Sequence, residues 1–410
     1  MPLSYLDPTA WRDMLQSHNW AGYVALTPEH IFLQAGFLQP LHMHTNPRIP
    51  VTSVATTDRI ALVIPRIQLA YLSQASIEVD VLVTFGEFDI RLAGTSSSDA
   101  ARALAELISH ENRARSWSEG VALACRRLGL DDGVLAHDET GLSDQGRELL
   151  RASVRVPMVG GIEAFREVRR CKTDRTLGII GEAVRITEES LVETVSAVRP
   201  GITQKELHHI YRSAVGRRGG VPGHVGIGVG SASVFPINLP IPKRIDPGDL
   251  IRLDVGALYG GFFADTARVV SVGPPTAATC KTYDALLAGE TAAVRQVRAG
   301  ARTSRIFHAA VDTVREVIKE YKRPHTGHAI GVSRYEIPLI APEPDEPIGV
   351  GEVVNVEVPL YDFEQGGFNI EDTVVVKPEG PVVLTSLPRE LLDAGEFLQR
   401  TRATKSAHDN

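Results

Sequence analysis

The sequence predicts an α+β protein in which a smaller α/β domain precedes a larger unit built from two similar halves. The chain has 410 residues, which is long enough to form two hydrophobic cores. Strand-like runs alternate with amphipathic stretches up to about residue 160, whereas the order helix, helix, hairpin occurs twice from about residue 174. Segments 260–266 and 366–373 echo each other, each with an acid after a Gly-Gly-Phe turn. We therefore expect an N-terminal domain over residues 1–165 and a duplicated domain over 174–395.

The expected elements of the first domain are short apolar runs and longer amphipathic stretches. Short runs bounded by turn residues are typical of strands, and apolar residues that recur at helical spacing are typical of helices. Their alternation is typical of an α/β domain. The predicted strands cover residues 20–26, 59–63, 79–85 and 134–138, and the predicted helices cover 98–111 and 117–128.

The second domain is expected to begin with a long helix over residues 175–198, which ends at Pro200 and Gly201. Thr203 and Glu206 have the spacing of a capping box at the start of the next helix. The other expected elements are strands over 225–230 and 250–255, helices over 282–299 and 303–321, and a second hairpin region over 353–376.

Each hairpin of the duplicated domain carries one acid on each arm, Asp254 and Asp265 in the first and Glu357 and Glu371 in the second. Alternation of side chains along a strand lets both acids of a hairpin face the same point. Carboxylates that are crowded away from water become protonated or repel one another unless a cation holds them. Acids beside glycine turns also occur as simple turn caps, but two such pairs that face each other predict a metal pair.

His328 lies between the two acid pairs in the sequence Thr-Gly-His-Ala-Ile-Gly. A single histidine is more often a structural residue, but four converging acids favour a metal ligand. Carboxylates together with an imidazole suit manganese, iron, cobalt or zinc. The lack of thiolate ligands argues against a structural zinc site.

The composition is that of an ordinary soluble globular protein, with 43% hydrophobic and 23% charged residues. A formal net charge of −7 argues against a nucleic-acid partner. Three widely spaced cysteines fit a reducing compartment. The first residues do not have the pattern of a signal peptide, and no uncharged apolar run reaches the ~18 residues of a membrane span. We expect a cytoplasmic protein with no membrane partner.

Taken together, the segments Leu-Asp-Val-Gly, Ala-Asp-Thr-Ala-Arg, Gly-His-Ala-Ile-Gly, Glu-Val-Pro and Ile-Glu-Asp-Thr resemble the pita-bread metallopeptidase family. This family includes prolidase, aminopeptidase P, methionine aminopeptidase and the metal-free creatinase. The resemblance covers about residues 174–390 and is strongest to the two-domain members. It implies a C-terminal pita-bread fold after a creatinase-type N-terminal domain, and a homodimer.

The resemblance also implies two divalent metal ions, with manganese favoured and cobalt, zinc or iron left open. The five positions that match the family's ligands are Asp254, Asp265, His328, Glu357 and Glu371. Glu357 matches the carboxylate that also serves as general base, which moves a proton from the nucleophile to the leaving amine.

The chain departs from the family around the metal ligands. Tyr335 stands where a second histidine is usual, Asn369 replaces the usual arginine, and the region near Asn238 lacks a further histidine. We therefore predict a changed substrate environment with Asn369, Asn238 and His224 in substrate binding, and with Tyr335 and His325 beside Glu357 in catalysis. For His224, a place at the edge of a strand is the alternative, and for His325 a place in a nearby loop.

These observations favour a metal-dependent amide hydrolase, similar to an Xaa-Pro dipeptidase or aminopeptidase, that acts on a short peptide or a small specialised substrate. The first alternative is a lyase or another small-metabolite enzyme with the metal as Lewis acid and Tyr335 as acid or base. Metal-free catalysis and a non-catalytic binding module are further alternatives, which the complete ligand set disfavours. His42 and His44 are either a solvated loop or a gate to the active site.

Overall fold

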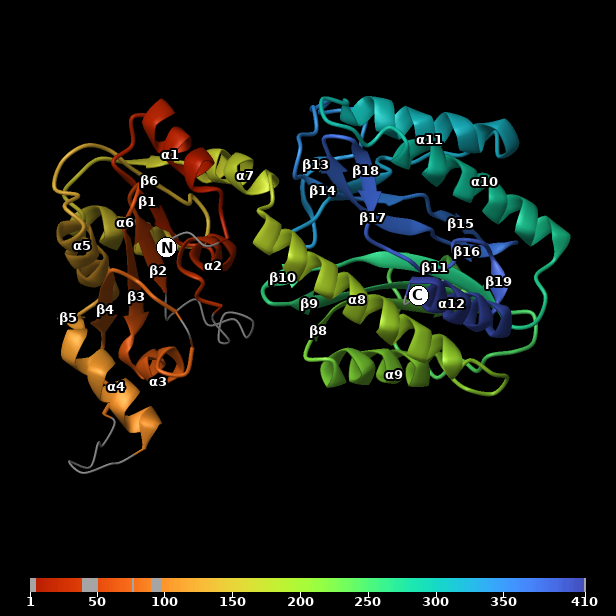
Figure 1. Ribbon diagram of the computed structural model, residues 1–410, viewed down its shortest axis with the longest axis horizontal. Helices are drawn as coiled ribbons and strands as arrows, with labels where there is room; N and C mark the ends of the chain where they lie inside the picture. The colour runs from red at the N-terminus through yellow and green to blue at the C-terminus, as the bar shows by residue number, and fades with distance from the viewer. Residues whose placement is uncertain (1–4, 39–50, 76, 90–97, 409–410) are drawn as a thin grey trace. The chain divides into compact units, whose positions relative to one another are not determined.

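The computed structural model describes residues 5–38, 51–75, 77–89 and 98–408, so the predictions for His42 and His44 lie outside the described residues. The chain forms two compact units, Met1–Arg169 and Arg170–Asn410 (Figure 1). Among the residues that the structure describes, none of the helices combines the length and apolar character that a bilayer crossing needs.

The first unit is built on a mixed sheet whose described strands follow the order β5-β4-β3-β2-β1-β6-β7. Strands β1 and β3 pair antiparallel with β2, and the other neighbours are parallel. Helix α5 packs on β3 and β4. The strands are β1 Gly22–Ala25, β2 Thr52–Ala55, β3 Ile60–Pro65, β4 Val81–Phe85, β5 Asn112–Ala114, β6 Leu135–His137 and β7 Met158–Gly160. The helices are α1 Pro8–Ser17, α2 Pro28–Ala35, α3 Leu69–Leu72, α4 Asp99–His110, α5 Trp117–Arg127, α6 Asp144–Ser153 and α7 Ile162–Arg170.

A buried carboxylate ties β1 and α2 to the end of β6 in this unit. Asp138 is 2% exposed. It accepts hydrogen bonds from the Tyr23 hydroxyl at 2.7 Å and from the backbone nitrogen of Leu26 at 2.7 Å. His30 Nδ1 lies 2.6 Å from the same carboxylate. The acid is therefore held by several donors, as a buried charge must be.

The second unit contains a curved, mainly antiparallel sheet whose central strands follow the order β10-β9-β11-β17-β14-β12-β13. Strand β8 extends it beside β9, β18 pairs with β17, and β19 pairs with β11. The strands of the first half are β8 Val221–Val229, β9 Leu250–Tyr259, β10 Phe262–Phe263 and β11 Thr266–Ser271. The later strands are β12 Gly327–Ala329, β13 Glu336–Leu339, β14 Val353–Glu357, β15 Leu360–Asp362, β16 Gly366–Phe368, β17 Glu371–Lys377, β18 Gly380–Val383 and β19 Leu392–Asp393.

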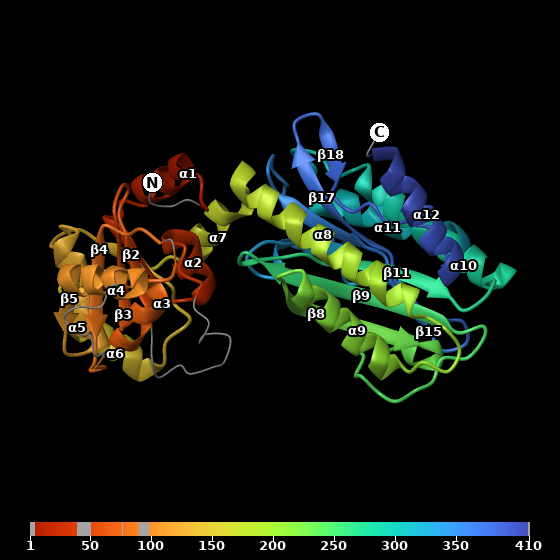
Figure 2. The same ribbon diagram turned by 60° about the horizontal axis from the view of Figure 1, so that its bottom comes forward.

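Two helix pairs cover this sheet. Helices α8 (Asp174–Ser196) and α9 (Gln204–Arg217) pack on β9 and β8, and α10 (Ala277–Val294) packs with α11 (Thr303–Val317) beside β14. Figures 1 and 2 show the two pairs on separate halves of the unit, with α12 (Ala394–His408) near α8. Each pair has its own buried apolar cluster, one around Leu207 and Leu253 and the other around Ile306 and Val356. The predicted duplication is therefore present as two helix-helix-sheet halves.

The helix limits agree with the prediction at the start of α9 and differ from it at the start of α10 and the end of α11. The capping box of Thr203 and Glu206 is present. Helix α10 begins at Ala277, five residues before the predicted start, because Thr276 accepts a hydrogen bond from the backbone nitrogen of Thr279. Helix α11 ends at Val317 rather than at residue 321, so the prediction was too long.

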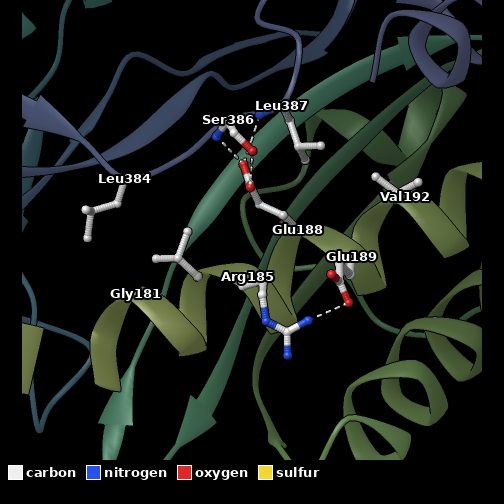
Figure 3. Close-up of a pocket in the computed structure, with 9 residues that line it drawn as sticks. Gly181, Arg185, Glu188, Glu189, Val192, Leu384, Ser386 and Leu387 are labelled. Atoms are coloured by element: carbon white, nitrogen blue, oxygen red, sulfur yellow. Dashed lines mark hydrogen bonds and ion pairs between the residues drawn. The ribbon is translucent and has the colours of Figure 1, made fainter. Parts of the chain in front are cut away.

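Helix α8 also holds the segment that follows β18. The Glu188 carboxylate accepts hydrogen bonds from the Ser386 backbone nitrogen and hydroxyl, at 2.6 and 2.7 Å, and from the Leu387 backbone nitrogen at 3.0 Å (Figure 3). A cavity lies at this position, and Glu188 is among the residues that line it. Both oxygens of its carboxylate already accept hydrogen bonds from the protein. We assign Glu188 a structural role.

Candidate metal centre

The strands of the second unit bring the two acid pairs to one place. Asp254 lies in β9, opposite Ala267 of β11, and Ala267 in turn lies opposite Glu371 of β17. Glu371 is also the direct partner of Glu357 in β14. Strands from both halves of the duplicated unit therefore contribute acids to neighbouring positions of one sheet.

Three buried side chains form the tightest cluster. Asp265, His328 and Glu371 each offer one ligand atom, and these atoms all lie within 4.8 Å of one another. His328 comes from β12, where it lies opposite Asn355. The Asn355 amide nitrogen donates to Glu371 Oε1 at 2.8 Å and orients that carboxylate.

The atoms of this cluster are suited to a metal ion. His328 Nδ1 lies 3.0 Å from the Ala329 carbonyl oxygen, which accepts only, so Nδ1 carries the hydrogen and Nε2 is left as the ligand atom. Asp265 Oδ1 is buried without a hydrogen-bond partner among the described residues. A buried carboxylate oxygen in that position is expected to have a cation beside it.

A cavity of about 320 Å³ opens over the cluster and is mainly polar. Eight of the predicted site residues line it, which places both acid pairs, His328 and the predicted catalytic residues in one site. The cavity is lined by His224, Pro236, Ile237, Asp254, Asp265, Arg323, His325, His328, Arg334, Tyr335, Glu357, Tyr361 and Glu371.

The two predicted asparagines are not among the side chains that line this cavity in the described structure. Asn238 donates to the Ala232 carbonyl oxygen at 2.7 Å and accepts from Arg252 at 2.6 Å, so its amide is engaged in holding an arginine. Asn369 is buried, and its amide nitrogen lies 3.5 Å from Asp254 Oδ2. Substrate binding by these two residues stays a prediction, and the contacts of Asn238 do not favour it.

Three arginines beside the acids were missed by the sequence reasoning. Arg252 Nη1 lies 2.9 Å from Asp254 Oδ2, and Arg334 Nη1 lies 3.3 Å from Asp265 Oδ2. The guanidinium of Arg323 lines the cavity wall, 5.7 Å from the centre of the Tyr361 ring. Sequence reasoning could have found Arg252, because it lies two residues before Asp254 and alternate residues of a strand share a face.

Comparison with known proteins identifies the second unit. Residues 178–378 match the sequence profile of metallopeptidase family M24. The second unit is a domain of metallopeptidase family M24. The predicted resemblance to prolidase and aminopeptidase P is confirmed, and the chain is a metallohydrolase.

Relatives of the chain align mainly over the same part. It is 28% identical over 237 residues to an Xaa-Pro dipeptidase of Pyrococcus furiosus, which covers 56% of the chain and 67% of that relative. It is 26% identical to an Xaa-Pro dipeptidase of Pyrococcus horikoshii, of which the alignment covers 66%. A putative dipeptidase of Bacillus subtilis, YkvY, is 24% identical over 70% of the chain and 80% of its own length. The chain thus spans about two thirds of the first two relatives.

Solved structures show that the fold extends through both units. An X-Pro aminopeptidase from Thermotoga maritima matches with a TM-score of 0.76 at 20% identity, over 94% of this chain and 99% of that one. Prolidase from Pyrococcus furiosus matches with a TM-score of 0.71 at 19% identity, over 92% and 99%. The predicted pita-bread fold behind an α/β N-terminal domain is confirmed.

Burial and mutual repulsion set the protonation of the acids in this M24 site. Burial, and next the Asp254 charge, raise the pKa of Asp265 and of Glu357 to about 7. Burial and the Asp265 charge raise the pKa of Glu371 well above its usual value. Asp254 differs, because the His224 hydrogen bond and the Arg252 charge outweigh the effect of burial and lower its pKa. Burial lowers the pKa of His328 to about 4, which keeps its imidazole neutral and able to bind a metal.

Tyr335 stacks on the His328 imidazole, with the ring centres 3.6 Å apart and the planes 21° from parallel. Burial and the charge of Glu357 raise the pKa of its hydroxyl, which therefore stays protonated at neutral pH and acts as a hydrogen-bond donor. A protonated phenol can act as an acid, but not as a base, in the lyase alternative. The M24 relatives described above are named as peptidases, so that alternative gains no support.

Proposed function

We propose that the chain is a metal-dependent hydrolase that cleaves the amide bond of short peptides, in the manner of an Xaa-Pro dipeptidase or aminopeptidase. The observation that carries the proposal is the group of Asp265, His328 and Glu371, whose ligand atoms lie within 4.8 Å of one another at the cavity. The relatives from Pyrococcus furiosus and Pyrococcus horikoshii are named Xaa-Pro dipeptidases, which supports the substrate class. Oxygen and nitrogen ligands suit manganese, which we propose as the metal, with cobalt, zinc and iron as alternatives.

A divalent metal at this cluster would lower the pKa of a water molecule and polarise the scissile carbonyl group. Glu357 lines the same cavity, and its Oε1 atom lies 3.5 Å from His325 Nδ1. We assign Glu357 as the general base, which accepts a proton from the attacking water and passes it to the leaving amine. We assign the hydroxyl of Tyr335 as the hydrogen-bond donor to the carbonyl oxygen, in place of the histidine that is usual in the family.

Arg323 provides a positive charge for the far end of a substrate. It lines the cavity, and its Nε atom is buried without a hydrogen-bond partner among the described residues. Its side chain forms no ion pair with a described residue at 4.0 Å or less, in contrast to Arg252 and Arg334. An unpaired guanidinium is suited to bind a carboxylate through two hydrogen bonds. We therefore propose that the substrate is short and ends in a free carboxylate.

A panel of dipeptides tests this function. Purified protein is stripped with a chelator, reloaded with manganese, cobalt, zinc or iron, and assayed with Xaa-Pro and other dipeptides by chromatography of the released amino acids. We expect cleavage that the chelator abolishes and metal restores. The absence of cleavage across the panel with every metal would overturn the peptidase assignment.

The predicted homodimer and cytoplasmic location stay proposals, for which sedimentation and cell fractionation are the measurements.

A further inference from the structure

We propose that this M24 centre binds one divalent metal ion tightly, at Asp265, His328 and Glu371, and that protein cations keep Asp254 from serving as a ligand of a second ion. The inference deepens the proposed metal-dependent function and rests on it. It departs from the two-ion centre that the family resemblance implies.

The carboxylate of Asp254 is engaged at both oxygen atoms. Oδ1 lies 3.2 Å from His224 Nε2, and Oδ2 lies 2.9 Å from Arg252 Nη1. The Asn369 amide nitrogen also approaches Oδ2, at 3.5 Å. A metal ion bound to Asp254 would share the carboxylate with these donors and would lie close to the positive charge of Arg252, which repels it. Asp265 is different, because its Oδ1 atom has no hydrogen-bond partner among the described residues.

Arg252 is fixed in place and does not leave Asp254 easily. Its side chain is 0% exposed. Nε donates to the Ser233 carbonyl oxygen at 2.9 Å, and Nη2 donates to the Phe235 carbonyl oxygen at 2.5 Å and to Asn238 Oδ1 at 2.6 Å. Since a buried charge is stable only with its partners, the network that holds the guanidinium also keeps its charge beside Asp254.

The charges of the site match one divalent ion better than two. Asp254, Asp265, Glu357 and Glu371 supply four negative charges when all are ionised. Arg252 and Arg334 each pair with one of these acids, at 2.9 and 3.3 Å, so two negative charges remain without a cation. One divalent ion makes this balance neutral. Two ions would leave two excess positive charges in a partly buried site, where like charges repel more strongly than in water. Arg323 adds one further positive charge in both cases, so the balance is +1 with one ion and +3 with two.

Metal content separates the one-ion from the two-ion site without any substrate. Stripped protein is titrated with manganese and with zinc by isothermal titration calorimetry, and the bound metal is counted by elemental mass spectrometry after gel filtration. We expect about one ion per chain and a single binding phase. About two ions per chain, with both phases at comparable affinity, would overturn the inference.

Matched substitutions of the two aspartates assign the ligands. Asp254→Asn keeps the side-chain size, and we expect it to retain one ion with at most a few-fold change in affinity. Asp265→Asn removes a ligand, and we expect its affinity to fall at least 100-fold. Circular dichroism confirms that each variant is folded before it is counted. Loss of an ion in Asp254→Asn, from two to one, contradicts the proposal.

Arg252→Met is the complementary variant. Removal of the guanidinium frees Asp254 Oδ2, so we expect a second, weaker ion to bind at high metal concentration. If this variant does not fold, the comparison of the two aspartate variants still decides the question. The outcome is also independent of peptide cleavage. A chain that binds one ion and cleaves no peptide would support this inference and contradict the proposed function. A chain that binds two ions and cleaves peptides would contradict this inference and support the proposed function.

Discussion

The guanidinium of Arg252 lies 2.9 Å from the carboxylate of Asp254, two residues further along strand β9. Both side chains point to the same face because alternate residues of a strand share a face. The pair supplies a positive charge inside a site where acids otherwise crowd together. Crowded carboxylates need cations, but these cations are not all metal ions: here arginine side chains provide part of the charge.

Substitution of Glu357 by glutamine tests its assignment as general base. We expect kcat to fall by about 10²–10⁴-fold, because the amide has the size of the carboxylate but accepts no proton. Metal content should not change, since Asp265, His328 and Glu371 remain. Steady-state kinetics and elemental analysis are the measurements. Glu364→Gln, at an exposed position nearby in the chain, is the control and should behave as wild type. A kcat within a few-fold of wild type in Glu357→Gln would remove the residue from the mechanism.

Arg323→Met tests recognition of the substrate carboxylate. We expect KM to rise roughly 10- to 100-fold for dipeptides with a free carboxylate, the range that loss of a charged hydrogen bond predicts. Peptides that end in an amide should show little further loss. Lys322→Met, at the exposed neighbouring position, is the matched control for the loss of one positive charge. Equal losses for acid and amide substrates would contradict the assignment.

Tyr335→Phe removes the hydroxyl but keeps the ring that stacks on His328. We expect unchanged metal content and a fall in kcat of about 100-fold, because one hydrogen bond to the developing oxyanion is lost. The assay compares kcat and metal binding in the same preparations. If the variant keeps near-normal kcat, the hydroxyl does not contact the reacting group.

Asp138→Asn tests the buried network of the first unit. Burial opposes ionisation of Asp138, but hydrogen bonds from His30, Tyr23 and Leu26 outweigh it and lower the pKa. A carboxyl group whose pKa is lower in the folded state stabilises the protein above its unfolded pKa of about 3.9, and this stabilisation is lost as the pH falls through the folded value. We expect the substitution to cost about 2–4 kcal/mol at pH 7 and progressively less below pH 4.

Tryptophan fluorescence during urea unfolding measures this effect, because all three tryptophans of the chain, Trp11, Trp20 and Trp117, lie in the first unit. Asp132→Asn, at an exposed position, is the control. A cost that stays constant between pH 7 and pH 3 would show that the charge of Asp138 is not what stabilises the network.

The sequence by itself determined the fold class, the family and the residues that gather at the site. Short motifs in the sequence reveal Asp254, Asp265, His328, Glu357 and Glu371. Five matches in the expected order outweigh the ambiguity of each single match. Helix limits such as the start of α10 at Ala277 depended on a single capping threonine, which a periodic pattern does not show.

Only the tertiary structure decided how the charges of the site are distributed. Arg252 and Asp254 are close in sequence, but Arg334 and Asp265 are 69 positions apart and meet through the folding of the sheet. The same folding directs Asn238 toward Arg252 and leaves Arg323 at the cavity without an ion-pair partner among the described residues. Electrostatic energy depends on the distance and burial of each pair, and these follow from the strand register and not from the spacing of residues in the chain.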